Sequence, residues 1–454
     1  MSSPVSSSVS KRPVVQVVVQ QHAEECEVLR HVRGVLLRAP HVQLHRLRRL
    51  DDRIAAHVDG LMSAGEAGLA LLTSSLDAPS PGKVFALAVC ALQSRDAATL
   101  TRLVTLAAAL PEAERGLLSA LGWVSSEDLQ GTVRALLGSK APVHRAWALA
   151  ACAMHRVDPG PMLTQAVQDA DAGVRARAWR VAGQLGRRDL ADAARLAVSR
   201  QAAALHDAHA TVVLSATGQT LDEQADKRAA AWALTLWGMG QNELVRQALI
   251  ALQPGRAWPS QDAHRLATIA APMDWGRDQV RALAAKAETS APAKRRMMRM
   301  AAWVGDVQVL PWLIHHMADD TWARLAGEAF SLITGADLAA LGLERKPPEG
   351  LEPGPNDDPQ DHNVAMDEDD SLPWPDQAKV KAWWQTNAAR FAVGQRYVVG
   401  EPPSAEHAVH VLKTAGQRQR IMAAEYLCLL RPGSMMLPVA APAWRQSRWL
   451  AAGA

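Results

Sequence analysis

The chain of 454 residues is rich in Ala, Leu, Val and Arg and contains 15 Trp, 3 Phe and 2 Tyr. Because strand-forming residues other than valine are scarce, the composition argues against a β-sandwich or a mixed sheet, and the many small residues suit closely packed helices. The formal net charge of +3 gives no global field that would favour nucleic acid or a membrane as partner.

The chain begins with a polar, serine-rich segment, residues 1–13, which we expect to be a disordered tail. The apolar stretch from Val14 to Val19 is too short for the core of a signal peptide. No run approaches the roughly 20 apolar residues of a transmembrane helix. The four cysteines lie far apart without C-x-x-C spacing, which favours free thiols in a reducing compartment. We therefore expect a soluble cytoplasmic protein with no membrane partner.

Residues 14–76 form a predicted N-terminal helical region, with helices over 14–38 and 42–61. In the second helix the apolar residues share one face. Its other face carries the first candidate partner-binding residues, Arg46, Arg49 and Arg53. This basic face could bind phosphate or an acidic partner. A solvated face, on which acidic residues alternate with the arginines, is the other explanation.

The clearest single helix is predicted over residues 171–186. Asp171 is the expected N-cap and Gly186 the expected glycine after the helix end. One apolar stripe runs between them at the spacing i, i+4, i+7 and i+11, formed by Val174, Ala178, Val181 and Leu185. The aspartate-led turn, the Val-Arg entry and the small-residue helix resemble the second helix of a HEAT-type repeat, which implies a solenoid that binds other macromolecules.

Similar helices recur along residues 77–343 and predict a repeat array. Trp147 and Trp179 are predicted to hold equivalent places, 32 positions apart, and a period near thirty with two helices per unit indicates an α-solenoid. We expect these tryptophans to be packing residues. The recurring helices are centred on 85–92, 116–124, 145–152, 174–185, 208–216, 228–237, 265–271, 294–303 and 325–333.

The sharpest basic patch of the array is the run K-R-R-M-M-R, with the candidate partner-binding residues Lys294, Arg295, Arg296 and Arg299. On a solenoid it could bind a nucleic-acid backbone, as HEAT-like DNA glycosylases do. The chain is not strongly basic and lacks dispersed exposed aromatic residues for base stacking. We therefore do not favour nucleic acid as the partner.

Residues 344–376 interrupt the helices with prolines, glycines and acidic residues and predict a long Pro-rich loop. Its candidate partner-binding residues are Asp367, Asp369 and Asp370. Clustered carboxylates can bind a hard cation, but D-E-D-D lacks the spacing of an EF-hand loop, and a solvated acidic loop is the alternative. We expect the loop to fold back on arginines of the array or to meet a basic partner. Its expected apolar anchors are Leu351, Val364, Met366, Leu372 and Trp374.

The C-terminal region, residues 377–454, returns to helix over 377–391, 404–413 and 417–430. Between and after these helices lie two short β-like segments, 396–399 and 435–439. We predict that they pair as a small β-hairpin, with Pro438 at an edge. The predicted fold is thus all-α, a HEAT-like solenoid of helical pairs with an acidic loop and a helical C-terminal region that bears this hairpin.

Catalytic motifs are missing, and we assign no catalytic, cofactor-binding or metal-binding residue. Another signal comes from the blocks at 17–25, 38–41, 49–53, 56–61, 324–335, 354–359, 363–376 and 382–384, of which P-N-D-D-P and L-P-W-P-D are the most specific. Together they resemble an uncharacterised proteobacterial family of HEAT-repeat proteins whose genes often lie in type VI secretion clusters, near PAAR-type spike-tip and effector genes. The resemblance implies a cellular context and transfers no catalytic residue.

From these observations we expect a non-catalytic scaffold that binds a secreted effector or a spike-tip protein, as immunity protein or loading adaptor. The alternative is a nucleic-acid-binding HEAT-like protein or a glycosylase-type enzyme.

Overall fold

The computed structural model describes residues 14–199, 219–251, 260–350, 360 and 367–453. In this part of the chain all regular secondary structure is helical, with isolated bridges and no strand, so the predicted all-α class is confirmed. The chain forms two compact units, Met1–Leu36 with His45–Ala135, and Leu37–Leu44 with Leu136–Ala454. The boundary predicted between residues 76 and 77 falls inside the first unit. The predicted tail, residues 1–13, lies outside the described residues.

The first unit is built around a helix that is buried on nearly all sides. In α4 (Pro81–Gln93) every residue from Val84 to Leu92 is buried, and the helix packs on α1, α3, α5 and α6. A Cβ atom on Gly116 would lie 2.6 Å from the Cβ atom of Val84, so glycine permits this close approach. The other helices are α1 (Gln16–Leu36), α2 (Leu44–Ser63), α3 (Glu66–Ser74), α5 (Ala97–Ala109) and α6 (Pro111–Trp123), and α7 (Thr132–Leu137) crosses the boundary between the units.

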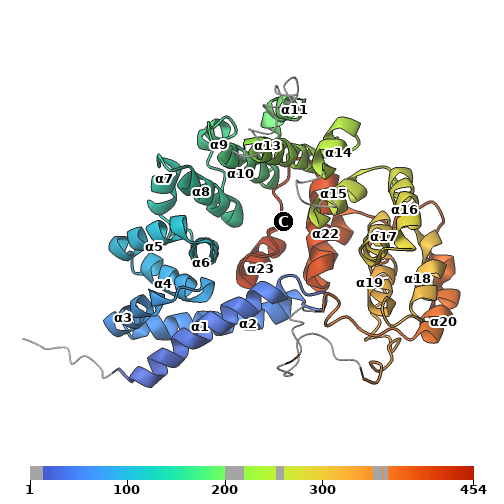
Figure 1. The fold of residues 1–454 in the computed structure, drawn as a ribbon, viewed down its shortest axis with the longest axis horizontal. Helices are drawn as coiled ribbons and strands as arrows, with labels where there is room; N and C mark the ends of the chain where they lie inside the picture. Colours follow the sequence, from blue (N-terminus) through green and yellow to red (C-terminus); the bar gives the residue numbers. More distant parts are fainter. Residues whose placement is uncertain (1–13, 200–218, 252–259, 351–359, 361–366, 454) are drawn as a thin grey trace, which may run out of the picture. The chain divides into compact units, whose positions relative to one another are not determined.

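The second unit contains a series of helices that pack on one another in chain order. Helix α8 packs on α10 and α10 on α13, while α15 packs on α17 and α17 on α19 (Figure 1). The intervening helices α9, α11, α14, α16 and α18 pack on this series. These contacts are compatible with an α-solenoid. The bounds are α8 (Pro142–His155), α9 (Pro161–Ala166), α10 (Ala172–Gln184), α11 (Ala191–Ser199), α13 (Gln219–Leu234), α14 (Glu243–Ile250), α15 (Gln261–Ala270), α16 (Met273–Ala287), α17 (Ala291–Val304), α18 (Leu310–His316) and α19 (Ala323–Thr334).

The helices predicted from small-residue stripes are found, except that 208–216 lies outside the described residues. Helix α10 begins as predicted, because the side chain of Asp171 accepts a hydrogen bond from the backbone N–H of Val174 at 2.9 Å. Gly186 has a φ of 70°, and a Cβ atom there would lie 2.1 Å from the carbonyl oxygen of Gly433. Only glycine fits this backbone approach.

An arginine at the fourth position of α8, α10 and α14 recurs with the same contacts. Arg145, Arg175 and Arg246 each donate from Nη1 to the main-chain carbonyls six and five residues earlier, at 2.9–3.3 Å. Because α8 begins at Pro142 and α10 at Ala172, Arg145 and Arg175 are equivalent and the local repeat is 30 residues. The predicted equivalence of the tryptophans 32 residues apart is therefore wrong by two positions, although both indole rings are buried.

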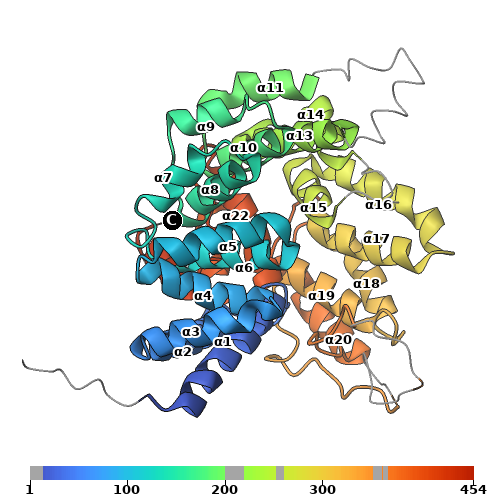
Figure 2. The same ribbon diagram turned by 60° about the vertical axis from the view of Figure 1, so that its left-hand side comes forward.

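The C-terminal helices belong to the second unit rather than to a separate region. Helix α22 (Gln417–Leu430) packs on α15 and on the π-helical turn Thr235–Met239, and α21 (Ala405–Thr414) packs on α22 and on α23 (Ala443–Ala451). The buried side chains of α22 join the core that α10, α13 and α15 share. In Figure 2, α20 (Gln377–Asn387) lies beside α18, on which it packs.

The predicted β-hairpin does not form, since its two segments meet helix ends instead of each other. Along the first segment, Tyr397 donates to the carbonyl of Gly305 just after α17, and Val399 donates to that of Leu332 in α19, at 2.9 and 2.6 Å. From the second, Met436 donates to the carbonyl of Gln184 at the end of α10, at 2.7 Å. The last carbonyls of a helix have no partner within the helix, and these two segments satisfy some of them.

Candidate functional site

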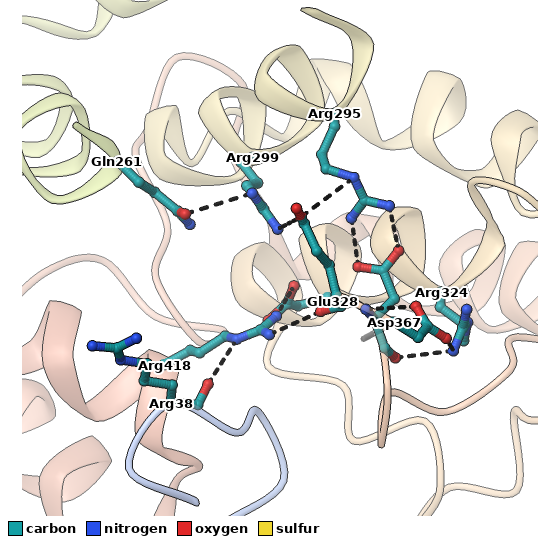
Figure 3. Close-up of polar contacts among 10 residues, drawn as sticks. Arg38, Gln261, Arg295, Arg299, Arg324, Glu328, Asp367 and Arg418 are labelled. Carbon is teal, nitrogen blue, oxygen red and sulfur yellow. Dashed lines mark hydrogen bonds and ion pairs between the residues drawn. The ribbon is translucent and has the colours of Figure 1, made fainter. Parts of the chain in front are cut away.

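Three helices of the second unit direct arginine side chains toward one place (Figure 3). Helix α17 supplies Arg295 and Arg299, one turn apart, while its other face buries Met297, Met298 and Met300 in the core. The remaining two arginines are Arg324 at the start of α19 and Arg418 at the start of α22. We call Arg295, Arg299, Arg324 and Arg418 the arginine cluster.

The cluster holds residues 367–370, which we call the acidic turn. The turn closes on itself, because the Asp367 side chain accepts from the backbone N–H of Asp369 at 2.9 Å and its carbonyl accepts from that of Asp370 at 3.2 Å. Asp369 is buried, and its side chain is 3% exposed. Glu368 lies outward, with its side chain 62% exposed.

Each arginine of the cluster binds this turn. Arg295 grips Asp369 with both terminal nitrogens, at 2.6 and 2.8 Å, which is the paired geometry in which guanidinium binds carboxylate most strongly. Arg299 donates to Glu368 at 3.1 Å. Arg324 forms an ion pair with Asp367 at 2.7 Å.

Two of the arginines also bind the main chain of the turn. Arg324 donates to the carbonyl oxygen of Asp369 at 3.1 Å, and Arg418 donates to that of Glu368 at 3.3 Å. Arg418 is itself fixed by both carboxylate oxygens of Glu328, at 2.8 and 2.9 Å. The cluster thus recognises the peptide chain as well as its carboxylates.

The chain just after the turn is anchored by buried apolar side chains. Leu372 and Trp374 are buried, and the guanidinium groups of Arg324 and Arg345 lie 4.6 and 5.1 Å from the Trp374 ring centroid. The backbone N–H of Arg345 donates to the Trp374 carbonyl at 2.8 Å. The expected docking at Leu372 and Trp374 is therefore found. The anchors predicted at Leu351, Val364 and Met366 lie outside the described residues.

The contacts of the site shift the pKa values of Arg295 and of Asp367. The hydrogen bond with Asp369 is the main cause that raises the pKa of Arg295, although burial opposes it. Burial works to raise the pKa of Asp367, but hydrogen bonds from Arg324 and from the Asp369 backbone, with the arginine charge, bring that pKa below its ordinary value. Both groups are therefore charged at neutral pH.

The structure brings two predicted sets together, because Arg295 of the basic run pairs with Asp369 of the acidic loop. Arg299 and Asp367 belong to the same site. The three residues of these sets that remain have other neighbours. Lys294 places its ammonium 5.0 Å from the ring centroid of Trp322. Arg296 contacts His264. Burial of the imidazole is the main cause that lowers the pKa of His264 to about 4, and the charge of Arg296 adds to it. Asp370 is exposed and accepts from the Ser371 hydroxyl at 3.2 Å.

The third predicted set lies on α2 in the first unit and takes no part in this site. Arg46, Arg49 and Arg53 are all exposed, and Arg53 forms a 3.7 Å ion pair with Glu25. The acidic residues of this helix are not all solvated, because Asp51 is fully buried and accepts from Arg33 at 2.6 Å.

Sequence analysis alone did not select Arg324, Arg418 or Glu328 as site residues. A signal for two of them was present, since Arg324 and Glu328 lie in the block 324–335 that carries the family resemblance, and the acidic turn lies in another such block. Arg418 stands in the first turn of a helix and had no comparable signal.

Metal ligands, membrane-spanning helices and reactive thiols mark other kinds of site. Among them, no group of three or more His, Cys, Asp or Glu is placed to hold a metal ion, and no helix has both the length and the apolar character needed to cross a bilayer. The thiols of Cys26, Cys90 and Cys428 have their pKa raised to about 12 by burial, and that of Cys152 to about 11. A nucleophilic cysteine needs a lowered pKa. Comparisons with protein-family models, curated proteins and solved structures find no match.

Proposed function

We propose that this chain is a non-catalytic protein-binding scaffold whose second unit is a HEAT-like α-solenoid. The observation that carries the proposal is the packing of α8, α10 and α13, and of α15, α17 and α19, in chain order. In such arrays each repeat buries its apolar stripe only against its neighbours, and the long faces that remain commonly bind other macromolecules.

We further propose that the scaffold works in the cytoplasm in a type VI secretion setting. Its partner would be a secreted effector or a PAAR-type spike protein, and its role that of immunity protein or loading adaptor. The sequence blocks quoted above support the setting, and the four free buried cysteines agree with a reducing compartment.

Co-purification tests this proposal directly. The tagged full chain is mixed with the effector and the spike-tip protein encoded beside its gene, and with an effector from an unrelated cluster as control. We expect one neighbouring protein to bind at micromolar concentration or below, and the control not to bind. Absence of binding to every neighbouring protein would overturn the proposal.

Deletion of the gene separates the two roles. Loss of an immunity protein poisons the cell or its sister cells, and a catalytically inactive effector rescues growth. Loss of an adaptor leaves growth unchanged and abolishes delivery of the effector. Growth is scored in competition between the deletion strain and its parent, and delivery is scored in competition with a susceptible strain that lacks the immunity protein.

The nucleic-acid alternative has less support, because two arginines of the basic run, Arg295 and Arg299, bind the acidic turn. A gel-shift assay with duplex DNA at ~50 mM salt tests it, since binding through phosphate contacts is strongest at low salt. A shift that charge reversal at Lys294 and Arg296 removes would favour this alternative over the scaffold.

A further inference from the structure

We propose that the arginine cluster is a receptor for an acidic segment of a protein partner, and that the acidic turn occupies it as an internal substitute. The inference deepens the proposed scaffold function by giving the chemistry of the partner and a mode of regulation. A partner segment with closely spaced carboxylates would displace residues 367–370 and take over their contacts. Recognition of acidic motifs by arginine clusters is a recurring mode of peptide binding.

The kind of ligand follows from what the cluster binds in its internal substitute. Three carboxylates, those of Asp367, Glu368 and Asp369, are held by three arginines. Arg324 and Arg418 add hydrogen bonds to two main-chain carbonyls of the same turn. A nucleic-acid backbone offers phosphates and has no peptide carbonyls, so the full set of donors matches an acidic polypeptide.

The charges of the site favour exchange of one acidic ligand for another. The ion pairs of the site join four guanidinium groups to four carboxylates, and three of these carboxylates come from the turn. If the turn leaves, the cluster retains Glu328 as its carboxylate partner in this set, and a strong positive charge attracts a new ligand. An incoming segment replaces charge-assisted hydrogen bonds with bonds of the same kind.

The connection between the turn and its anchors permits this exchange. Ser371 joins them, and its φ of 65° lies in the left-handed region that L-residues rarely adopt. Release of the turn frees Ser371 from this conformation, while the buried Leu372 and Trp374 keep the chain attached. Because the tethered turn has a high effective concentration, it weakens the apparent affinity of any competitor.

A synthetic peptide supplies the test, with no need to know the natural partner. The probe is a labelled peptide that copies residues 367–372, D-E-D-D-S-L, and its control carries N-Q-N-N-S-L. Binding is measured by fluorescence anisotropy at low salt with the wild-type chain and with the variant Asp367→Asn/Glu368→Gln/Asp369→Asn. We expect the variant to bind the acidic probe at least about tenfold more tightly, since its own turn no longer competes, and neither protein to bind the control peptide.

Two further variants make the result specific. Asp192→Asn/Asp278→Asn/Glu288→Gln removes the same number of negative charges from exposed acids and should bind the probe as the wild type does. Adding Arg299→Gln to the neutralised turn should abolish the gain. If the triple variant is poorly folded by its melting curve, Glu368→Gln alone, at an exposed side chain, should still give a gain of about threefold.

Three outcomes would overturn the inference: equal affinity of wild type and neutralised turn, an equal gain in the charge-matched control, or a gain for duplex DNA in place of the peptide. The co-purification assay keeps this failure distinct from failure of the proposed function. A chain that still binds a neighbouring effector while the neutralised turn gives no gain remains a scaffold without this receptor.

Discussion

Two arginine–carboxylate pairs of the second unit have nearly the same geometry and different surroundings. Arg265 of α15 grips Glu425 of α22 with two nitrogens, both at 2.8 Å, and Arg295 grips Asp369 at 2.6 and 2.8 Å. The side chains of the first pair are 10% and 3% exposed, and those of the second are 23% and 3% exposed. The main difference is that Glu425 belongs to a packed helix, whereas Asp369 belongs to a short turn.

This difference decides which part of the molecule is destabilised when one partner of a pair is removed. A buried charge without its partner is costly in either place. In α22 the charge cannot reach water unless the helix leaves the core, so the cost falls on the whole unit. In the acidic turn the charge can reach water by local undocking, so the cost cannot exceed the free energy of that undocking. The pair of Arg265 and Glu425 therefore stabilises the fold of the unit. The pair of Arg295 and Asp369 stabilises only the docked state of the acidic turn.

The largest effect on stability is expected when the pair of Arg265 and Glu425 is broken. Glu425→Ala leaves Arg265 charged and buried without its main partner, and should lower the free energy of unfolding by about 3–5 kcal/mol. Urea denaturation followed by circular dichroism measures it. Replacing both partners, Arg265→Met with Glu425→Leu, should recover most of the loss. Arg281→Ala, at a pair whose side chains are 72% and 64% exposed, should change stability by less than about 0.5 kcal/mol.

The next largest effect is expected at the anchor of the turn. Trp374→Ala removes a buried indole on which two guanidinium groups stack, and should cost about 3 kcal/mol. The thermal melting temperature should fall, and a protease should cut near the acidic turn faster than in the wild type. An unchanged melting temperature together with wild-type cleavage would show that the loop is not docked there.

Breaking the pair of Arg295 and Asp369 should give a smaller change in the free energy of unfolding and a larger change in local order. Arg295→Met strands the buried Asp369, which escapes by undocking, so we expect about 1–2 kcal/mol rather than the full cost of a buried charge. Endoproteinase Glu-C, which cleaves after acidic residues, should cut at Glu368 much faster. Combining Arg295→Met with Asp369→Asn should restore part of the stability. A loss as large as that of Glu425→Ala would contradict the distinction between the two pairs.

The smallest effect is expected from acid, which should release the acidic turn. Because the pKa of Asp367 is lowered in the folded chain from 3.8, its ion pair contributes fully above that value and is lost as the pH falls through the lowered pKa. Hydrogen exchange of the 367–372 backbone, corrected for the intrinsic effect of pH, should increase over this range. In Asp367→Asn the dependence should be weaker, and an unchanged dependence would assign it to another group.

Sequence reasoning found the helices because their signals are local. The stripe within 171–186 and its two end signals lie in one segment, and α10 follows them. The site depends on contacts that no local pattern encodes, since Arg295 and Asp369 are 74 residues apart in the chain. That the loop could fold back on arginines was predicted, but the arginines from α19 and α22 were not.

The hairpin failed for a related physical reason. Neither segment forms a strand, and Val399 lies in a turn with a φ of 49°. β-propensity describes a conformation and does not choose its hydrogen-bond partner. The carbonyls near the ends of α10, α17 and α19 provide acceptors. In addition, Arg396 donates to the carbonyls of Ile269 and Ala271 at the end of α15. The C-terminal segments thus form hydrogen bonds with carbonyls near helix ends, in place of the hydrogen bonds that they would have formed with each other in a hairpin.

The recurring arginine of α8, α10 and α14 constrains the backbone path before each helix and leaves the residue types there unconstrained. Each of these arginines is held by two main-chain carbonyls, and the residues that supply them differ in every case: Ser139 and Lys140, Asp169 and Ala170, Gly240 and Gln241. Every residue type carries a carbonyl, so substitutions at these upstream positions leave the contact intact as long as the backbone keeps its path. At each of these three helices the contact therefore constrains one side chain, the arginine, and it leaves the two residues that supply the carbonyls free to differ in type.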